Sequence, residues 1–411
     1  MSVSSRFGSH IRSFAIVGAV AIALAACQTK PVETAPPPST PAEAPPPNAL
    51  TANSPAFLTM PNIPADHTPV RVGIILPFSS GTPAVRALAQ AMVKAATMAL
   101  YESGNKDIVL MTADEGSTPA DAADAGQKLL NQGAEIIVGP LYATSVKAIA
   151  GAARDRGVAV LSFSTDRSVA GDGVFLISFL PTNDTDRVVS YALAHGHHKI
   201  AALIPDNLYG DVTLGALRGA VTNGKGELGQ VQRFPATVDG VLNPATAIAH
   251  TDADAVFIPQ AGAILHAAAP TLSSGGLDPF KVKLLGTGQW EDPSLSSEPT
   301  LNGAWFAAPD PKDEVAFNAK FRAAYGTDPP QLAGLAYDAV SLIAKLAERG
   351  EPYKRFTRAA IADPNGFSGA DGIFRFMADG TAERGLAILS VGPEGFRVVD
   401  PAPTTFVKPG S

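Results

Sequence analysis

The sequence predicts an α/β protein with two doubly wound, Rossmann-like lobes. Short apolar runs rich in β-branched residues alternate with segments whose apolar residues keep helical spacing, from residue 70 to about residue 310. The alternation restarts after Asp166, which indicates a second sheet. Polar, turn-forming residues follow the strands, at the sheet edge where open α/β folds bind ligands. The sequence therefore predicts a small-molecule site at these strand ends.

The unit from 135 to 166 shows the pattern most clearly. An apolar strand at 135–138 stops at Gly139-Pro140, and a helix with Thr144 or Ser145 as its cap ends at Gly157. The next strand, 158–161, runs into the hydroxyl cluster that precedes Asp166. Two strands joined by one helix form a parallel, right-handed unit, so we expect this unit to form one wall of the site.

The other elements of the first lobe follow from the same reasoning. Strands are expected at 70–76 and 107–111, and helices at 83–102 and 119–131. Strand 70–76 is apolar almost throughout, as expected for a strand buried on both faces.

The second lobe repeats the pattern. Its expected strands are 199–204, 230–234, 255–258, 283–285 and 304–307. Its expected helices are 184–195, 209–223 and 263–272. The stretch 173–180, which precedes them, is expected to be a strand or an extended crossover. Helices are then expected at 313–325, 331–349 and 353–362, and the tail is antiparallel, with strands at 373–376, 386–391 and 396–399. An Asp379-Gly380 turn supports a hairpin there.

The N-terminus predicts export and a lipid anchor. Residues 1–26 combine two arginines with an apolar run at 14–26 that is too short to span a bilayer. The run ends Leu-Ala-Ala-Cys and resembles the bacterial lipobox, which implies lipid modification of Cys27. Gln28, where an Asp would favour the inner membrane, points to the outer membrane. The alternative is an ordinary signal peptide with an incidental cysteine.

Residues 27–68 are rich in proline and predict a disordered tether. Such a segment prefers polyproline II and cannot bury a core. It is interpreted as a spacer that holds a domain off a membrane, and a ligand for a proline-recognition module is the alternative.

Composition and motifs argue against several function classes. The net charge is −7, so a basic surface for nucleic acid is not expected. The sequence has no P-loop, no dinucleotide-binding glycine motif after a strand and no nucleophile elbow. Cys27 is the single cysteine, which excludes an intrachain disulfide. We therefore expect no enzyme, no cofactor and no metal; the histidines at 195, 197 and 198 are interpreted as a solvated helix end rather than as ligands.

What remains is the binding of a small polar solute by hydroxyl groups and free backbone N–H groups. Each candidate follows a strand end or begins a helix, and each could equally be an ordinary cap or turn residue. The candidate ligand-binding residues are Ser79, Thr144, Ser145, Ser164, Thr165, Asp166, Tyr209, Gln260, Gln289 and Trp290.

Five stretches, in order, carry a resemblance to a known family: VGIILPFSSG, EIIVGPLYATSVKAIAG, GVAVLSFSTD, ALIPDNLYGD and LLGTGQW. Together they resemble the type I periplasmic binding proteins of the leucine/isoleucine/valine class. The resemblance implies two lobes joined by three crossovers with the ligand in a hinge cleft. It covers 69–402, with a first lobe of 69–181 and 311–362 and a second of 182–310 and 363–402.

The resemblance also implies roles for single residues. Ser164, Thr165 and Asp166 lie in the segment that contacts the amino and carboxylate groups of the ligand, and Tyr209 matches the tyrosine of a YG motif. Ala143 stands where amino-acid binders carry a serine that binds the carboxylate. Gln289 and Trp290 stand where an acidic residue often binds the ammonium group.

Two functions follow from these observations. The first is a lipid-anchored periplasmic solute-binding protein that presents an amino acid or a similar small polar solute to an ABC permease. The second rests on PFSSGTPAVRALAQAMVKAATMAL and GTAERGLAILSV, which look like a lipoprotein subgroup labelled penicillin-binding protein activator-like. That resemblance implies a peptidoglycan synthase as the partner.

Overall fold

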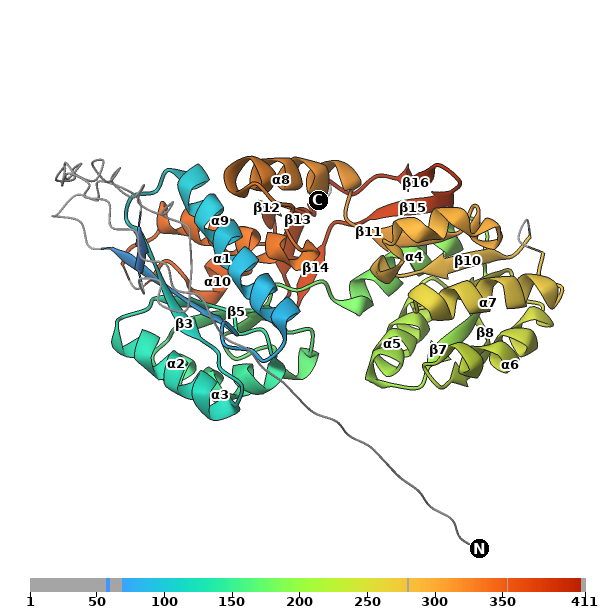
Figure 1. The fold of residues 1–411 in the computed structure, drawn as a ribbon, viewed down its shortest axis with the longest axis horizontal. Coiled ribbons are helices and arrows are strands. Elements are labelled where there is room, and N and C mark those ends of the chain that lie inside the picture. Colours follow the sequence, from blue (N-terminus) through green and yellow to red (C-terminus); the bar gives the residue numbers. More distant parts are fainter. Residues whose placement is uncertain (1–56, 60–68, 279–280, 353, 408–411) are drawn as a thin grey trace, which may run out of the picture. The chain divides into compact units, whose positions relative to one another are not determined.

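A computed structural model describes residues 57–59, 69–278, 281–352 and 354–407. The described chain contains a six-stranded sheet, a seven-stranded sheet and a small three-stranded sheet (Figure 1). The expected signal peptide, the lipidation site and most of the expected tether lie outside these residues. None of the helices that the structure describes has the length and apolar character needed to cross a membrane.

The first lobe is built on the six-stranded sheet, in the order β1-β3-β2-β4-β5-β6. The strands are β1 (Phe57–Thr59), β2 (Val70–Leu76), β3 (Ile108–Asp114), β4 (Ile136–Val138), β5 (Ala159–Ser162) and β6 (Val174–Leu176). β2 pairs in parallel with β3 and β4, as the alternation of strands and helices predicts. The strands from β2 to β6 consist mostly of apolar residues, as expected for a sheet whose two faces are both covered by helices.

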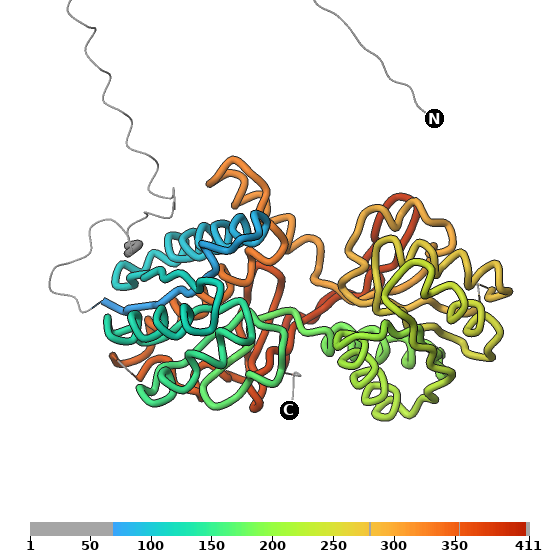
Figure 2. Tube along the Cα trace, turned by 60° about the horizontal axis from the view of Figure 1, so that its bottom comes forward, coloured from blue at the N-terminus to red at the C-terminus, as the bar shows by residue number. Residues whose placement is uncertain are grey.

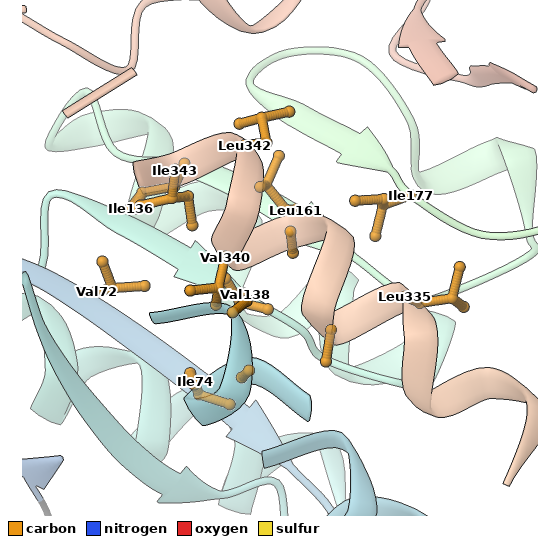
Figure 3. Packing of buried hydrophobic residues seen from close by; sticks show 14 of the residues in the cluster. Val72, Ile74, Ile136, Val138, Leu161, Ile177, Leu335, Val340, Leu342 and Ile343 are labelled. Carbon is orange, nitrogen blue, oxygen red and sulfur yellow. The ribbon is translucent and has the colours of Figure 1, made fainter. Parts of the chain in front are cut away.

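Two helix layers cover this sheet. α1 (Pro83–Ser103) and α9 (Gly334–Ala347) share a buried core with Val72 and Ile74 of β2, and α9 lies across the strands in Figure 3. On the other face, α2 (Pro119–Asn131) and α3 (Ala143–Asp155) pack against Ile75. α8 (Pro311–Tyr325) packs against α1 through Phe317 and Phe321. α8 and α9 therefore pack with the first lobe.

The second lobe is built on the seven-stranded sheet, in the order β16-β15-β11-β10-β9-β7-β8. Its strands are β7 (Lys199–Pro205), β8 (Glu227–Phe234), β9 (Ala255–Phe257), β10 (Lys283–Gly286), β11 (Trp305–Ala308), β15 (Ala387–Gly392) and β16 (Gly395–Asp400). α4 (Pro181–Ala194) and α5 (Leu208–Asn223) contribute to one core, and α6 (Val238–Ala249) and α7 (Gly262–Ser274) to another.

The chain crosses between the two large sheets three times, and its path can be followed in Figure 2. The crossovers lie between β6 and α4, between β11 and α8, and between β14 (Ala382–Arg384) and β15. Three connections between two sheets are the topology that the family resemblance implied.

The structure corrects the predicted tether at one point. β1 lies within 27–68, yet Phe57–Thr59 pairs antiparallel with β3, from Met111 to Val109. Backbone hydrogen bonds to β3 hold this short strand. It could not be recognised from the sequence, because the segment around it is rich in proline.

The structure also places part of the tail differently. The expected second lobe included all of 363–402, but β12 (Phe367–Gly369), β13 (Gly372–Phe376) and β14 form the small sheet. Phe367, Phe374 and Phe376 are buried in the core that contains α9. The small sheet therefore belongs with the first lobe, and only β15 and β16 complete the second sheet.

Two helices differ from the expectation. The expected helix at 331–349 is divided into the 3-10 turn η5 (Gln331–Ala333) and α9, and the helix expected at 353–362 is reduced to α10 (Arg358–Ile361). α3 begins at Ala143 with Tyr142 as its N-cap, so neither Thr144 nor Ser145 caps it.

Candidate functional site

A cavity of about 340 Å³ lies where the first two crossovers pass between the lobes. This volume is within the range of small-molecule sites. Its walls come from both lobes and from the crossovers themselves: Thr165, Phe179, Pro181, Asp184, Tyr209, Gly288, Gln289, Glu291, Pro309, Gln331 and Leu332. A solute held here would contact both lobes.

Tyr209 of α5 forms one wall of the cavity. Its phenol oxygen lies 3.0 Å from Oγ1 of Thr287, which is completely buried. Asn207 caps α5 by accepting a hydrogen bond from the Gly210 backbone N–H. A Cβ on Gly210 would lie 1.9 Å from the Pro205 carbonyl oxygen, so the YG pair lets the helix start close to the end of β7. Burial raises the pKa of Tyr209 above its usual range, so the phenol stays neutral.

Asp184 stands in the first turn of α4 and points towards the loop after β10. Its Oδ2 accepts a hydrogen bond of 3.1 Å from the backbone N–H of Gly288. Burial raises the pKa of Asp184 to about 7, against the opposing effect of this hydrogen bond. A half-buried carboxyl group that is ready to ionise near neutral pH therefore faces the cavity.

Glu291 follows the 3-10 turn η2 (Gly288–Trp290) and connects the two lobes. Its Oε2 accepts a hydrogen bond of 2.9 Å from Nε2 of Gln331, in η5 of the first lobe. Burial, together with the neighbouring carboxyl groups of Glu314, Asp371 and Asp184, raises the pKa of Glu291 to about 8, against the opposing effect of the Gln331 hydrogen bond.

The first-lobe wall is formed by the segment after β5, where most of the hydroxyl groups bond within the protein. Ser162 Oγ donates to the Pro140 carbonyl and accepts from the Ser164 N–H. Ser164 is buried, and its Oγ accepts from the Asp166 N–H. Thr165 is exposed and lines the cavity.

The structure brings three of the ten predicted residues to the cavity: Thr165, Tyr209 and Gln289. Asp166 caps the 3-10 turn η1 (Arg167–Val169) through the Ser168 N–H, and hydrogen bonds from Ser168 lower its pKa. Ser79 and Gln260 do not line the cavity: the Ser79 N–H donates to Asp114, and the Gln260 carbonyl accepts from Trp290.

Trp290 lies in the core of the second lobe. It is completely buried, and its Nε1 donates to the carbonyl oxygens of Ile258 and Gln260. The indole covers Gly286, where a Cβ would lie 2.1 Å from Trp290 Cδ2. Trp290 therefore supports the loop that carries Gln289 and Glu291 rather than the cavity surface.

The loop before α3 binds the side-chain carboxylate of Glu115, a residue that follows β3. Glu115 is 1% exposed, and its Oε2 and Oε1 accept from the backbone N–H groups of Leu141 and Tyr142, at 2.9 and 3.0 Å. The Ser145 side chain also bonds to Glu115 and is buried, whereas Thr144 is exposed and does not line the cavity. Burial raises the pKa of Glu115, and these hydrogen bonds oppose that shift.

Sequence reasoning missed the two acidic residues of the cavity. Asp184 comes three residues after Pro181 and has the pattern of an ordinary first-turn carboxylate. Glu291 comes directly after Trp290, one residue beyond the stretch LLGTGQW that carries the family resemblance. No group of three or more His, Cys, Asp or Glu residues suited to a metal ion occurs in the described part of the chain.

The sequence profile of a family described as "Periplasmic binding protein" matches residues 69–395. The chain belongs to this family. It is of the type I class with leucine-binding-protein-like members, and this confirms the expected fold. The family binds solutes and is not enzymatic, which confirms the expectation that the protein is no enzyme.

Solved structures show the same fold at low sequence identity. An ABC transporter substrate-binding protein from Sphaerobacter thermophilus is 19% identical, with a TM-score of 0.65 over 82% of this chain and 98% of that one. One from Desulfitobacterium hafniense, in complex with Leu, is 18% identical, with a TM-score of 0.60 over 80% and 99%. A solute-binding protein from Rhodopseudomonas palustris BisB5, in complex with 3,4-dihydroxybenzoic acid, is 18% identical, with a TM-score of 0.58 over 83% and 99%.

An uncharacterized Rickettsia prowazekii protein is 26% identical over 104 residues, which are 25% of this chain and 28% of that protein.

Proposed function

We propose that this periplasmic binding protein holds a small polar solute in the cavity between its lobes and presents it to an ABC permease. The cavity carries the proposal, because its walls come from both lobes and from two of the three crossovers. A solute that contacts both walls would favour a closed arrangement of the lobes, which is the basis of hinge closure.

A small polar solute with an ammonium group is the class that the cavity supports, and both amino acids and amines belong to this class. Asp184 and Glu291 supply carboxylates for the ammonium group, while Thr165, Gln289 and Tyr209 supply neutral polar contacts. The related structures named above hold Leu and an aromatic acid, so the family fold accommodates solutes of this size.

A thermal-shift screen of the purified protein against amino acids, amines and envelope metabolites tests this proposal. A solute at 100 times its dissociation constant should add about 2.7 kcal/mol to the free energy of unfolding. We expect at least one compound of the polar, ammonium-bearing class to raise Tm by several degrees. The absence of any shift across the screen would refute solute binding.

We also propose that Cys27 carries a lipid anchor in the outer membrane, and that residues 27–56 act as the tether. This proposal is supported by the lipobox resemblance, which ends at the single cysteine of the sequence. Cys27→Ser should release the protein from the membrane fraction, as followed by fractionation and immunoblotting. A variant that stays in the membrane fraction would contradict the anchor. Activation of a penicillin-binding protein stays a prediction from sequence alone.

A further inference from the structure

The charges on the cavity wall differ from those that an amino acid requires. Two of the lining residues, Asp184 and Glu291, are acidic, and the described lining includes no lysine, arginine or histidine. An amino acid carries one positive and one negative group, so its carboxylate would lie near two acidic side chains without a cation to balance it.

The charged side chains that shift the pKa of Glu291 are all acidic, and each comes from a different part of the fold. These neighbours are Asp184 of α4, Glu314 of α8 and Asp371 between β12 and β13. Together with burial they raise the pKa of Glu291 to about 8. A cation placed beside Glu291 would remove this repulsion, whereas an anion would add to it.

Three donors at the start of α3 that could hold a ligand carboxylate are already engaged. The Leu141 and Tyr142 N–H groups and the Ser145 side chain all bond to Glu115, and Ala143 has no hydroxyl group. A ligand carboxylate that used these donors would have to displace the buried Glu115 side chain.

The buried cation that contacts a residue of the cavity wall, Arg384, already has a carboxylate partner. The Arg384 guanidinium stacks on the ring of Phe179 at 4.5 Å, does not line the cavity and is paired with the Asp338 carboxylate at 3.1 Å. Phe179 and Tyr209 are the two aromatic residues of the wall. Aromatic walls attract organic cations through the negative faces of their rings.

We propose that the solute of this cavity is an organic cation, an amine with an apolar or aromatic body and no free carboxylate. This inference rests on the proposed solute-binding function and narrows it. Three features favour a positively charged solute: the acidic side chains of the cavity, the engaged donors of the α3 loop and the aromatic wall.

Matched compounds that share an apolar body and differ in the charged groups they carry test the inference. The full chain is titrated calorimetrically with 2-phenylethylamine, L-phenylalanine and 3-phenylpropionate, and with 3-methylbutylamine, L-leucine and 4-methylpentanoate. In a series that binds, we expect the amine to bind at least tenfold more tightly than its amino acid. An amino acid or acid that binds as tightly as the amine would overturn the inference and leave the proposed function standing. No binding in either series, together with no hit in the broad screen, would overturn both.

Glu291→Gln tests the role of the carboxylate. We expect the variant to lose at least tenfold in amine affinity while its Tm without ligand stays the same or rises, because a half-buried carboxyl group with acidic neighbours is removed. Glu394→Gln, in the exposed turn between β15 and β16, removes the same charge away from the cavity and should bind as the wild type does. Equal amine affinity in all three proteins would overturn the inference.

The pH dependence gives a second readout. Because the amine pairs with ionised Glu291, whose pKa is about 8 without ligand, its affinity should rise between pH 6 and pH 8. Glu291→Gln should flatten this rise. A wild-type affinity that falls over the same range would contradict the inference.

Discussion

Replacement of Arg384 by methionine is expected to lower the free energy of unfolding by about 3–5 kcal/mol, because it leaves the buried Asp338 carboxylate without its charge partner. The Arg384 side chain is 1% exposed and that of Asp338 is 0% exposed. Nη1 of Arg384 donates to Asp338 Oδ2 at 3.1 Å, and Nη2 donates to the Ile177 carbonyl at 2.9 Å. One side chain thus connects the third crossover, the first crossover and α9. Urea unfolding followed by circular dichroism measures the loss.

A double variant separates the charge effect from the loss of packing. Asp338→Asn combined with Arg384→Met removes both charges, so it should be more stable than Arg384→Met alone. The Asp338 carboxylate also accepts from the Ala370 N–H, and an asparagine oxygen can keep that bond. An Arg384→Met variant within 1 kcal/mol of the wild type would show that the ion pair does not stabilise this junction.

Trp290→Ala is expected to destabilise the second lobe by about 3–5 kcal/mol, as is usual for the truncation of a buried aromatic side chain. The substitution leaves a cavity above Gly286 and removes the donor to the Ile258 and Gln260 carbonyls. Thermal or urea unfolding measures the change.

Trp305→Ala is the matched control for this prediction. Trp305 of β11 is only half-buried and stacks with Lys283 at 4.5 Å, so its loss should cost less than that of Trp290. If Trp290→Ala unfolds like the wild type but loses ligand affinity, the indole would be a ligand contact rather than a core residue.

The strands and most helices could be predicted because their signals are local. β2 and β4 are apolar on both faces and end in turn residues, so seven or three residues suffice to recognise them. The start of α3 could not be predicted in this way. Glu115, 26 residues before Leu141, satisfies the N–H groups that a local cap would otherwise bind.

Long-range packing explains the remaining differences in the fold. The Asp379-Gly380 turn was expected, but β13 pairs with β14 rather than with the longer strand that follows. Phe374 then packs with α9 in the first lobe. The pattern of a short antiparallel strand does not specify the sheet or helix against which it packs.

The site was predicted in part for similar reasons. Tyr209 and Gln289 follow strand ends, so a general rule about sheet edges found them. Asp184 and Glu291 matter because other elements bury them and place acidic neighbours around them. That electrostatic environment exists only in the folded chain.

The most direct test of solute binding between the lobes is a distance measurement between spin labels on α2 and α6. It uses a variant with Cys27 replaced and is made with and without the solute found in the screen. We predict that the distribution of distances narrows and shifts to shorter values when the solute is added. Saturating binding without any change in this distribution would contradict a cavity that closes on its ligand from both lobes.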